Sequence, residues 1–335
     1  MRSYYPLPGA HSVCDNEAQL ATKHTFPNPQ ACAPRYVDFS VNLKRRQPTG
    51  LCYIMKNLAS GDEPLEFTPC KIETEWGHHR IGHCQAGFSS TISGSNYVVG
   101  APGSFYWQGQ VYAYDALTNS TLATNDTGKA NDDQYKGYSI VSGRFTRNSD
   151  GSDVAVGIPK GNKNLSGLVT ILNSKMKVIG HLEGERQGSF GYFGYAIAAL
   201  DANGDGLTDL AVSAPMFTEA SNGLEYEQGR VYIFYQLETG FFTNPNRLNG
   251  FRSKSRFGQA LASLGKRREF LRVVSQKFRL RAVVFPRRHH QEGMRFAGGR
   301  RAVWRRKWQG RSVHLQRRSS RPDREADPED RGRRL

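Results

Sequence analysis

The stretch from Phe193 to Phe234 decides the fold. It opens with FGYAIAALDANGDGLTDLAVSAPMF (residues 193–217) and closes on GRVYIF (residues 229–234). A Phe-Gly pair precedes a short apolar segment, Ala196 to Leu200, and a second apolar segment runs from Leu210 to Ser213. Short apolar runs bounded by Gly, Pro and Asp residues are typical of β-strands. The stretch therefore predicts two strands joined by an acidic loop.

The acidic loop places oxygen-bearing side chains at alternate positions. They are Asp201, Asn203, Asp205 and Asp209, and the carbonyl of Leu207 is a further donor. Ca²⁺ binds about six to eight oxygen ligands, which an alternating loop that turns on glycine can supply. An EF-hand would need a Glu where Val212 stands, so the loop is predicted to be a shorter strand-loop-strand calcium turn. The alternative is an Asx-rich hairpin that holds no metal.

The unit repeats along the chain. Its openings are Ala86-Gly87-Phe88-Ser89, Lys136-Gly137-Tyr138-Ser139, Phe193-Gly194-Tyr195-Ala196 and Phe257-Gly258-Gln259-Ala260, at spacings of 50, 57 and 64 residues. Three of these units continue with a strand end at Pro102, Pro159 or Pro215 and then a Gly-x-Val opener at Gly109, Gly167 or Gly229. A period of about 60 residues with several short strands per unit predicts a β-propeller with one four-stranded blade per repeat.

These repeats resemble the FG-GAP repeats of integrin α subunits. The resemblance is strengthened by GAPGSFYWQGQV (residues 100–111), CQAGF (84–88) and ACAPRY (31–36), and it covers roughly residues 30–264. It is closest in type to an integrin head without an inserted domain, in an invertebrate-like subgroup that binds arginine-glycine-aspartate sequences. The resemblance implies an all-β fold, a partial β-propeller with about three to four of roughly seven blades. It also implies an extracellular ligand-binding head that mediates cell–matrix adhesion as a heterodimer with an integrin β subunit.

The resemblance further implies two disulfides, Cys32–Cys52 and Cys70–Cys84. Each would stabilise the fold by roughly 3 kcal/mol on a chain-entropy estimate. Cys14 is left over, and we expect its partner in upstream sequence together with a missing first blade. Three glycosylation sequons, at Asn119, Asn125 and Asn164, fit a secretory route.

The chain shows neither the apolar core of a signal peptide nor a stretch of about 20 apolar residues that could span a membrane. An integrin α subunit has both. We therefore expect an incomplete chain of a type I cell-surface protein, attached to the plasma membrane only through a missing C-terminal span.

Charge divides the chain at Gly265. Residues 266–335 hold 23 Lys and Arg against 7 Asp and Glu, whereas residues 1–265 hold 23 of each, so the net charge of +16 lies entirely in the tail. We predict a poorly defined segment 1–29, a partial propeller 30–265 and a disordered Arg-rich tail 266–335, because highly charged sequence cannot offset its ordering entropy. A reading-frame change or a mispredicted exon explains the break. The alternative is a basic arm that binds nucleic acid, with Trp304 and Trp308 for stacking.

Candidate ligand contacts are acidic and aromatic residues in loops. The resemblance implies that an α subunit of this subgroup supplies a carboxylate for the ligand's guanidinium, whose planar fork suits a bidentate pair. Glu219 is the first candidate, and Asp153 and the pair Asp132-Asp133 are second choices. The alternative for Asp153 is an acid that caps the turn before its strand, and the alternative for Asp132-Asp133 is a solvated loop. Phe105, Tyr106 and Trp107 form a candidate partner interface or ligand wall, and the alternative is packing under their own loop.

Catalysis is not predicted. The sequence lacks G-x-S-x-G and H-E-x-x-H motifs and has no pair of acids beside a His in one motif. Two other functions stay open beside the adhesion receptor. One is a secreted propeller module of another protein, such as an accessory domain of a hydrolase, and the other is a protein that binds nucleic acid through its basic tail, although we expect no nucleic-acid partner.

Overall fold

The computed structural model describes residues 30–40, 45–55, 63–72, 77, 79–146, 153–186, 190–219, 226–263, 270–275, 283–284, 308–309 and 312–313. Within these ranges the regular structure is almost entirely β-strand. The short helical elements there are α1 (Ser104–Trp107) and the 3₁₀ turn η3 (Lys129–Asn131). The predicted all-β fold class is confirmed.

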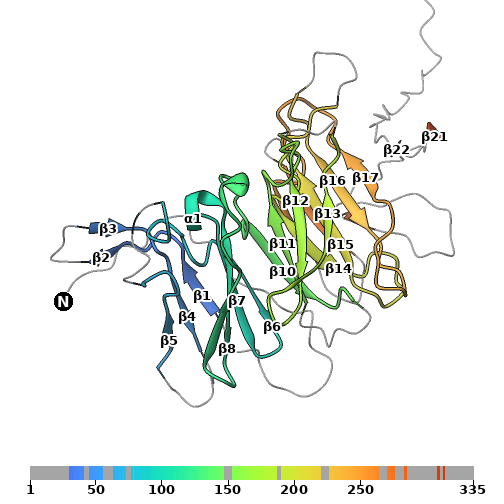
Figure 1. The fold of residues 1–335 in the computed structure, drawn as a ribbon. Coiled ribbons are helices and arrows are strands. Elements are labelled where there is room, and N and C mark those ends of the chain that lie inside the picture. The colour runs from blue at the N-terminus through green and yellow to red at the C-terminus, as the bar shows by residue number, and fades with distance from the viewer. Residues whose placement is uncertain are drawn as a thin grey trace, which may run out of the picture.

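Three meanders of four antiparallel strands form the centre of the structure, one for each complete repeat (Figure 1). We call them blades A, B and C. Blade A contains β6 (Ser89–Ser93), β7 (Asn96–Ala101), β8 (Gln110–Asp115) and β9 (Ser120–Ala123). Blade B contains β10 (Ser139–Gly143), β11 (Asp153–Ile158), β12 (Leu168–Leu172) and β13 (Val178–Glu183). Blade C contains β14 (Ile197–Leu200), β15 (Asp209–Ala214), β16 (Arg230–Phe234) and β17 (Asn246–Asn249).

Smaller sheets flank these blades. A three-stranded sheet before blade A contains β1 (Gln30–Ala33), β4 (Leu51–Ile54) and β5 (Leu65–Phe67), and β2 (Asp38–Ser40) pairs with β3 (Arg45–Gln47). Another three-stranded sheet follows blade C and contains β18 (Ala260–Ser263), β19 (Phe270–Val274) and β20 (Val283–Val284).

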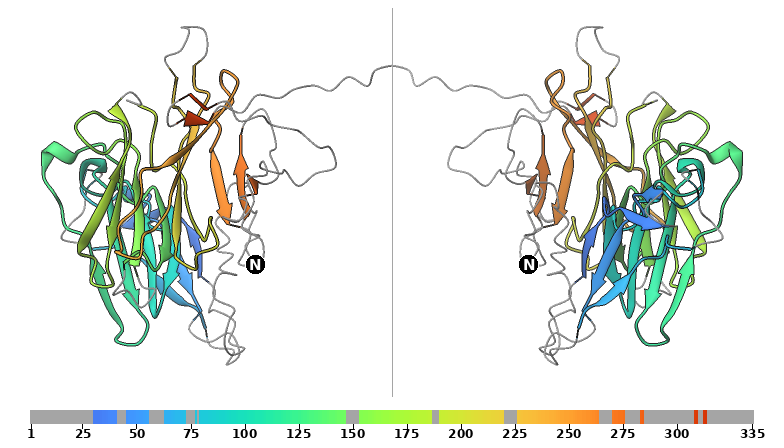
Figure 2. Two further views of the ribbon diagram at one scale, coloured as in Figure 1. Left: turned by 90° about the vertical axis from the view of Figure 1, so that its right-hand side faces the viewer. Right: turned by 90° about the vertical axis from the view of Figure 1, so that its left-hand side faces the viewer.

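The first strands of consecutive blades lie next to one another along the inner side of a curved row of sheets (Figures 1 and 2). The Thr91 hydroxyl on β6 donates to the Ser142 hydroxyl on β10 at 3.0 Å. The Ser139 hydroxyl on β10 donates to the carbonyl oxygen of Gly194, just before β14, at 2.8 Å. The same inner strand therefore recurs at equivalent places, as in a β-propeller, and the predicted partial propeller is confirmed.

The core lies between the blades. Every residue of β11 and β15 is buried, which explains why these strands read as continuous apolar runs and do not alternate. Ala155 and Val169 of blade B share one buried cluster with Val212 and Tyr232 of blade C. All four residues of β9, the outer strand of blade A, are exposed, so burial in this blade decreases toward its outer edge.

A glycine before the third strand of each blade lets its backbone touch the next blade. Gly109 forms a parallel bridge to Lys136 and Gly167 forms one to Phe193, and Gly50, before β4, meets Ala86 in the same way. Gly229 occupies the equivalent place against Phe257. These glycines have φ values of 78–97°, and a Cβ on any of them would overlap backbone atoms of the following repeat. Glycine is needed there both for its left-handed conformation and for the close approach.

The predicted strand ends and disulfides also occupy the expected places. Pro102, Pro159 and Pro215 follow the last residue of the second strands β7, β11 and β15, so the three Pro-containing ends are equivalent. Both implied disulfides, Cys32–Cys52 and Cys70–Cys84, are present, and the first joins residues paired across β1 and β4. Cys14 and the segment 1–29 lie outside the described residues.

Short strands lie at a few places beyond Gly265, within the segment 266–335 for which a disordered tail is predicted. β19 pairs with β18, and its Leu271 and Val273 are fully buried. A short hairpin of β21 (Trp308–Gln309) and β22 (Ser312–Val313) lies beside β17. Leu271–Val274 pair with Ala260–Ser263 of β18, although the surrounding sequence is strongly basic. The rest of the tail, including Trp304, lies outside the described residues.

The described part of the chain has no helix with the length and apolar character of a membrane span.

Candidate functional site

Four loops of blades A to C open at one end of the structure. Their described residues are 102–109, 124–138, 159–167, and 215–219 with 226–229, and we call this side the α1 end (Figure 1). In an antiparallel meander the turns after the second and fourth strands lie at one end, and the turns after the first and third strands lie at the other. The acidic loop 201–208 follows a first strand, so it lies at the opposite end from α1.

The element α1 is a left-handed turn made of aromatic residues. Phe105, Tyr106 and Trp107 have φ values of 46°, 54° and 58°. Left-handed backbone costs an L-residue roughly 1–2 kcal/mol, so neighbouring structure must hold the turn in place. The N–H of Phe105 donates to the Arg80 carbonyl at 2.5 Å, and the N–H of Tyr106 donates to the His79 carbonyl at 2.8 Å. The segment before blade A therefore shapes this turn.

The turn presents aromatic surface to solvent. Tyr106 is 49% exposed, and its ring stacks on His79 with centroids 5.0 Å apart. Trp107 meets the same imidazole edge-on at 6.0 Å. Phe105 instead packs against the core of blade A, as the alternative for this cluster anticipated. Exposed aromatic groups of this kind are suited to recognition.

Asp132 and Asp133 lie against the same turn, although they come from the loop that leads from blade A into blade B. The amide group of the buried Gln108 donates to the Asp132 carboxylate at 2.8 Å. The N–H of Asp133 donates to the Tyr106 carbonyl at 3.0 Å. We call Tyr106, Trp107, Gln108, Asp132 and Asp133 the acidic–aromatic site. A partly exposed carboxylate beside aromatic rings attracts cations by charge and by cation–π contact, so this site can bind a guanidinium or an ammonium group.

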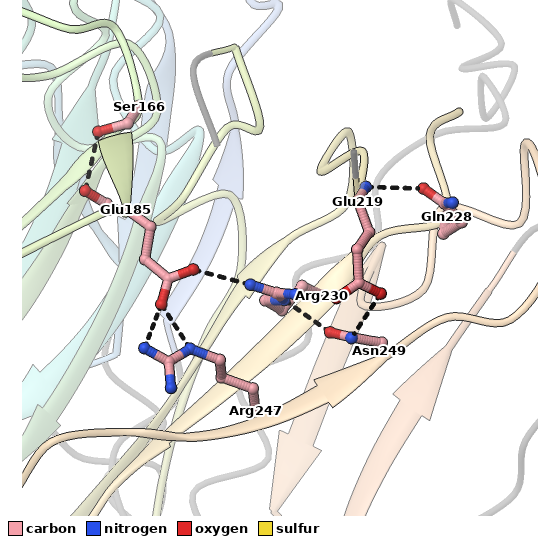
Figure 3. Close-up of polar contacts among 8 residues, drawn as sticks. Ser166, Glu185, Glu219, Gln228, Arg230, Arg247 and Asn249 are labelled. Carbon is pink, nitrogen blue, oxygen red and sulfur yellow. Dashed lines mark hydrogen bonds and ion pairs between the residues drawn. The ribbon is translucent and has the colours of Figure 1, made fainter. Parts of the chain in front are cut away.

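Glu219 also lies at the α1 end, but both of its carboxylate oxygens are engaged within the protein (Figure 3). Its Oε1 is 3.2 Å from a guanidinium nitrogen of Arg230, and its Oε2 accepts a hydrogen bond from the Asn249 side chain at 3.1 Å. Arg230 also contacts Glu185 at 2.7 Å, and Arg247 binds that same Glu185. The first candidate for a ligand carboxylate therefore belongs to an internal network.

This network ties blade C to blade B. Arg230 on β16 is only 5% exposed, and its guanidinium lies 3.7 Å from the centroid of the Phe217 ring. Glu185 follows β13 of blade B, so the Arg230–Glu185 pair crosses between blades. Two arginines face two carboxylates, which balances the charge in a partly buried place where an unpaired charge would be costly.

Asp153 does not join the other candidates. It begins β11, at the opposite end from α1, and is 3% exposed. Its Oδ2 accepts hydrogen bonds from the N–H groups of Phe145 and Thr146 and from the Thr146 hydroxyl. Asp153 caps the turn before its strand, which was the alternative for this residue, and we remove it from the candidate ligand contacts.

The acidic loop is closed by hydrogen bonds to its own backbone. Asp201 accepts from the N–H groups of Gly204, Asp205 and Gly206, and Asp205 accepts from the N–H of Leu207. The Asn203 side chain donates to Asp205 at 2.6 Å. Within the described residues, no group of three or more His, Cys, Asp or Glu side chains is positioned to hold a metal ion. These contacts are those of an Asx-rich hairpin, and the types of donor are those that Ca²⁺ prefers.

Asp209 is the buried member of the loop and is fully shielded from solvent. Its carboxylate accepts from the N–H of Ala202 and from the N–H of Gln236, both at 2.8 Å. Burial raises the pKa of Asp209 to about 6; the two N–H bonds oppose this rise, and the charges of Asp205 and Asp201 add to it. The carboxylates thus repel one another, and a divalent cation would offset that repulsion.

The three sequon asparagines are exposed. Asn119 lies in the β8–β9 turn, Asn125 follows β9, and Asn164 lies in the loop between β11 and β12. All three can therefore carry a glycan without displacing the core.

Comparisons with known proteins agree with this architecture. Residues 193–234 match the FG-GAP repeat family. The chain is 38% identical over 284 residues to integrin alpha-PS2 of Drosophila melanogaster, covering 74% of this chain and 20% of that protein. It is 38% identical over 253 residues to integrin alpha-V of Gallus gallus (70% and 23%) and 31% identical over 251 residues to integrin alpha pat-2 of Caenorhabditis elegans (70% and 20%).

These matches support a chain of the integrin α type, and the part they cover corresponds to the FG-GAP head. The chain spans between a fifth and a quarter of the length of these relatives. Among solved structures, the β-propeller domain of the Trilobed protease from Pyrococcus furiosus aligns with 68% of this chain and 55% of that one, at 13% identity and a TM-score of 0.36, too low a similarity to bear on the fold.

The Arg230 network predicts a stability difference between two arginine variants. Arg230→Met leaves Glu185 and Glu219 without their shared cation, and we expect a loss of about 2–3 kcal/mol in the free energy of unfolding. Arg256→Met removes the more exposed pair with Glu227, in which both side chains are about one-third exposed, and should cost less than about 1 kcal/mol. Urea denaturation of the two variants measures both values. Equal losses would show that the network does not anchor the blades.

Proposed function

We propose that this chain forms the ligand-binding head region of an integrin α-type adhesion receptor. It acts at the cell surface as a heterodimer with an integrin β subunit and binds extracellular matrix proteins. The acidic–aromatic site carries the proposal, because residues of two loops meet there at the end where α1 and the long loops lie. The similarity to integrin α chains supports the receptor class, and we assign no enzymatic activity to the chain.

We propose that Asp132 is the carboxylate that receives a basic group of the ligand, in an arginine-glycine-aspartate type of recognition. The Oδ1 atom of Asp132 accepts one hydrogen bond, from Gln108, and the exposed Asp133 lies beside it. Both oxygens of Glu219, in contrast, already accept hydrogen bonds from Asn249 and Arg230. A guanidinium could reach Asp132 without breaking an ion pair, whereas at Glu219 it would have to displace Arg230.

We further propose that the acidic loop binds Ca²⁺ through Asp201, Asn203, Asp205, Asp209 and the carbonyl of Leu207. The donor types suit this ion, and the mutual repulsion of the carboxylates supplies a reason for binding it. The loop lies at the opposite end from the acidic–aromatic site, so the role of the ion is to stiffen the hairpin between β14 and β15. Glycans at Asn119, Asn125 and Asn164 and a membrane span outside this sequence complete the proposed cell-surface protein.

The ligand proposal predicts a specific loss of binding. The full chain is co-expressed with an integrin β subunit, and binding to an immobilised arginine-glycine-aspartate peptide is measured by surface plasmon resonance. Asp132→Asn should weaken binding at least about tenfold, because the charge facing the guanidinium is lost. Asp126→Asn removes a charge from the same loop and keeps a side-chain oxygen that accepts from the Gly128 N–H, so it should bind the peptide as the original protein does.

Two results would contradict this proposal. One is that the chain without any substitution neither pairs with a β subunit nor binds the peptide. The other is full binding by Asp132→Asn together with loss of binding in Glu219→Gln, which would move the ligand contact to Glu219.

The calcium proposal predicts a melting temperature that depends on the ion. Millimolar calcium should raise the melting temperature of the unchanged chain relative to chelator, because the ion binds the folded loop only. Asp205→Ala should abolish this rise, whereas Asp115→Ala, at the end of β8 in blade A, should keep it. Differential scanning calorimetry of the three proteins, each with calcium and with chelator, measures these rises. A rise that survives in Asp205→Ala would mean that the loop does not bind the ion.

A further inference from the structure

We propose that the Cys70–Cys84 disulfide is a positioning element for the acidic–aromatic site. It fixes the short segment 79–84, and that segment in turn holds the left-handed turn in which Tyr106 and Trp107 lie. The consequence for ligand binding rests on the function proposed above, whereas the consequence for the shape of the turn does not.

The contacts between the two segments are made by backbone groups. The N–H groups of Gly103, Phe105 and Tyr106 donate to the carbonyl oxygens of Cys84, Arg80 and His79, at 3.1, 2.5 and 2.8 Å. All three acceptors lie within six consecutive residues. The position of that segment therefore determines whether the turn can form its hydrogen bonds, whatever side chains the turn carries.

The two segments also approach too closely for an ordinary residue at Gly103. A Cβ on Gly103 would overlap the carbonyl group of His83. The φ of Gly103 is −86°, which any residue can adopt, so only the contact with segment 79–84 requires glycine there. The close approach is thus a second, independent sign that the turn is built against this segment.

Segment 79–84 lies between β5 and β6 and belongs to no described strand. Its anchors include the buried Ile81 and Cys84, which share a cluster with Cys70, and local bonds from the N–H groups of Arg80 and Gly82 to the Gly77 carbonyl. The disulfide links Cys84 to Cys70, 14 residues earlier and just after β5. It is the covalent part of this anchor.

The second disulfide provides a matched comparison, because it cannot have the same role. Cys32 and Cys52 are directly paired residues on β1 and β4, and the strand ladder already holds them together. The two bridges lie in the same region and join residues 20 and 14 positions apart in sequence. Removing Cys32–Cys52 therefore takes away a comparable covalent link, yet it leaves segment 79–84 attached to Cys70. Opening Cys70–Cys84 lets the segment shift. The left-handed turn then relaxes and moves Tyr106 away from Asp133.

Hydrogen exchange of the full chain, read by mass spectrometry with residue-level fragmentation, tests the structural half. In the double variant Cys70→Ser/Cys84→Ser, the amides of Gly103, Phe105 and Tyr106 should exchange at least about tenfold faster, whereas amides of β7 and β8 keep their protection. In Cys32→Ser/Cys52→Ser, the amides of the turn should exchange at the original rate. Unchanged exchange of the turn in the first variant, with blade A intact, overturns the proposal.

A third variant decides the matter if the loss of Cys70–Cys84 unfolds blade A. Gly103→Ala keeps both disulfides and pushes the turn off segment 79–84, so it should speed exchange at Phe105 and Tyr106 in the same way. Full protection of those amides in Gly103→Ala would overturn the proposal, because the turn would not depend on the segment.

Peptide binding then separates this inference from the proposed function. With the β subunit present, the affinity for the arginine-glycine-aspartate peptide should fall at least about fivefold in Cys70→Ser/Cys84→Ser, and it should stay unchanged in Cys32→Ser/Cys52→Ser. Fast exchange of the turn together with a peptide affinity unchanged in every variant would keep the structural inference and count against the acidic–aromatic site as the place of binding. If the chain without any substitution binds no peptide, the proposed function is refuted, whereas the structural inference is not affected.

Discussion

Direct contact between the backbones of consecutive blades is the constraint on which the rest of this structure depends. At Gly109 the chain of blade A runs against Lys136, just before blade B begins. The residues that precede Lys136 are thereby brought beside the left-handed turn, where the N–H of Tyr135 donates to the Trp107 carbonyl at 2.9 Å. The contact that packs two blades together therefore also assembles the acidic–aromatic site, and residues about 25 positions apart in sequence become one surface.

Two acidic residues at the same end of the molecule differ in what already surrounds them. Glu219 is held by Arg230 and Asn249 in a charge-balanced network, and its removal would leave a nearly buried arginine short of a partner. Asp132 is held by an uncharged amide, that of Gln108, and keeps its charge available. Both residues are acids, so what distinguishes them is whether charged groups of the protein already bind their carboxylates. Glu219 is bound in this way and stabilises the fold, whereas Asp132 is not, which is why we favour Asp132 as the ligand contact.

The repeat, the all-β class and the equivalent Pro-containing strand ends could be predicted, because each depends on short sequence patterns of glycines, prolines and apolar runs. The two disulfides followed from the family resemblance. The role of Asp153 could not be separated from that of Asp132 in sequence, since both are acids outside apolar runs and only the structure places them at opposite ends. Nothing in SFYWQG predicts three consecutive positive φ values, because segment 79–84 imposes them from outside. The buried Leu271 and Val273 were hidden by the basic composition around them.

The central claim is that a glycine is required wherever one blade meets the next, and paired glycine variants test it most directly. Gly109 and Gly128 have nearly equal φ values of 84° and 83°, but a Cβ on Gly109 would overlap Lys136, whereas a Cβ on Gly128 would meet open space. We predict that Gly109→Ala lowers the free energy of unfolding by at least about 4 kcal/mol, and that Gly128→Ala lowers it by about 1–3 kcal/mol, the cost of backbone strain alone. Equal losses in the two variants, measured by urea denaturation, would contradict the account, because consecutive repeats would then not touch at these glycines.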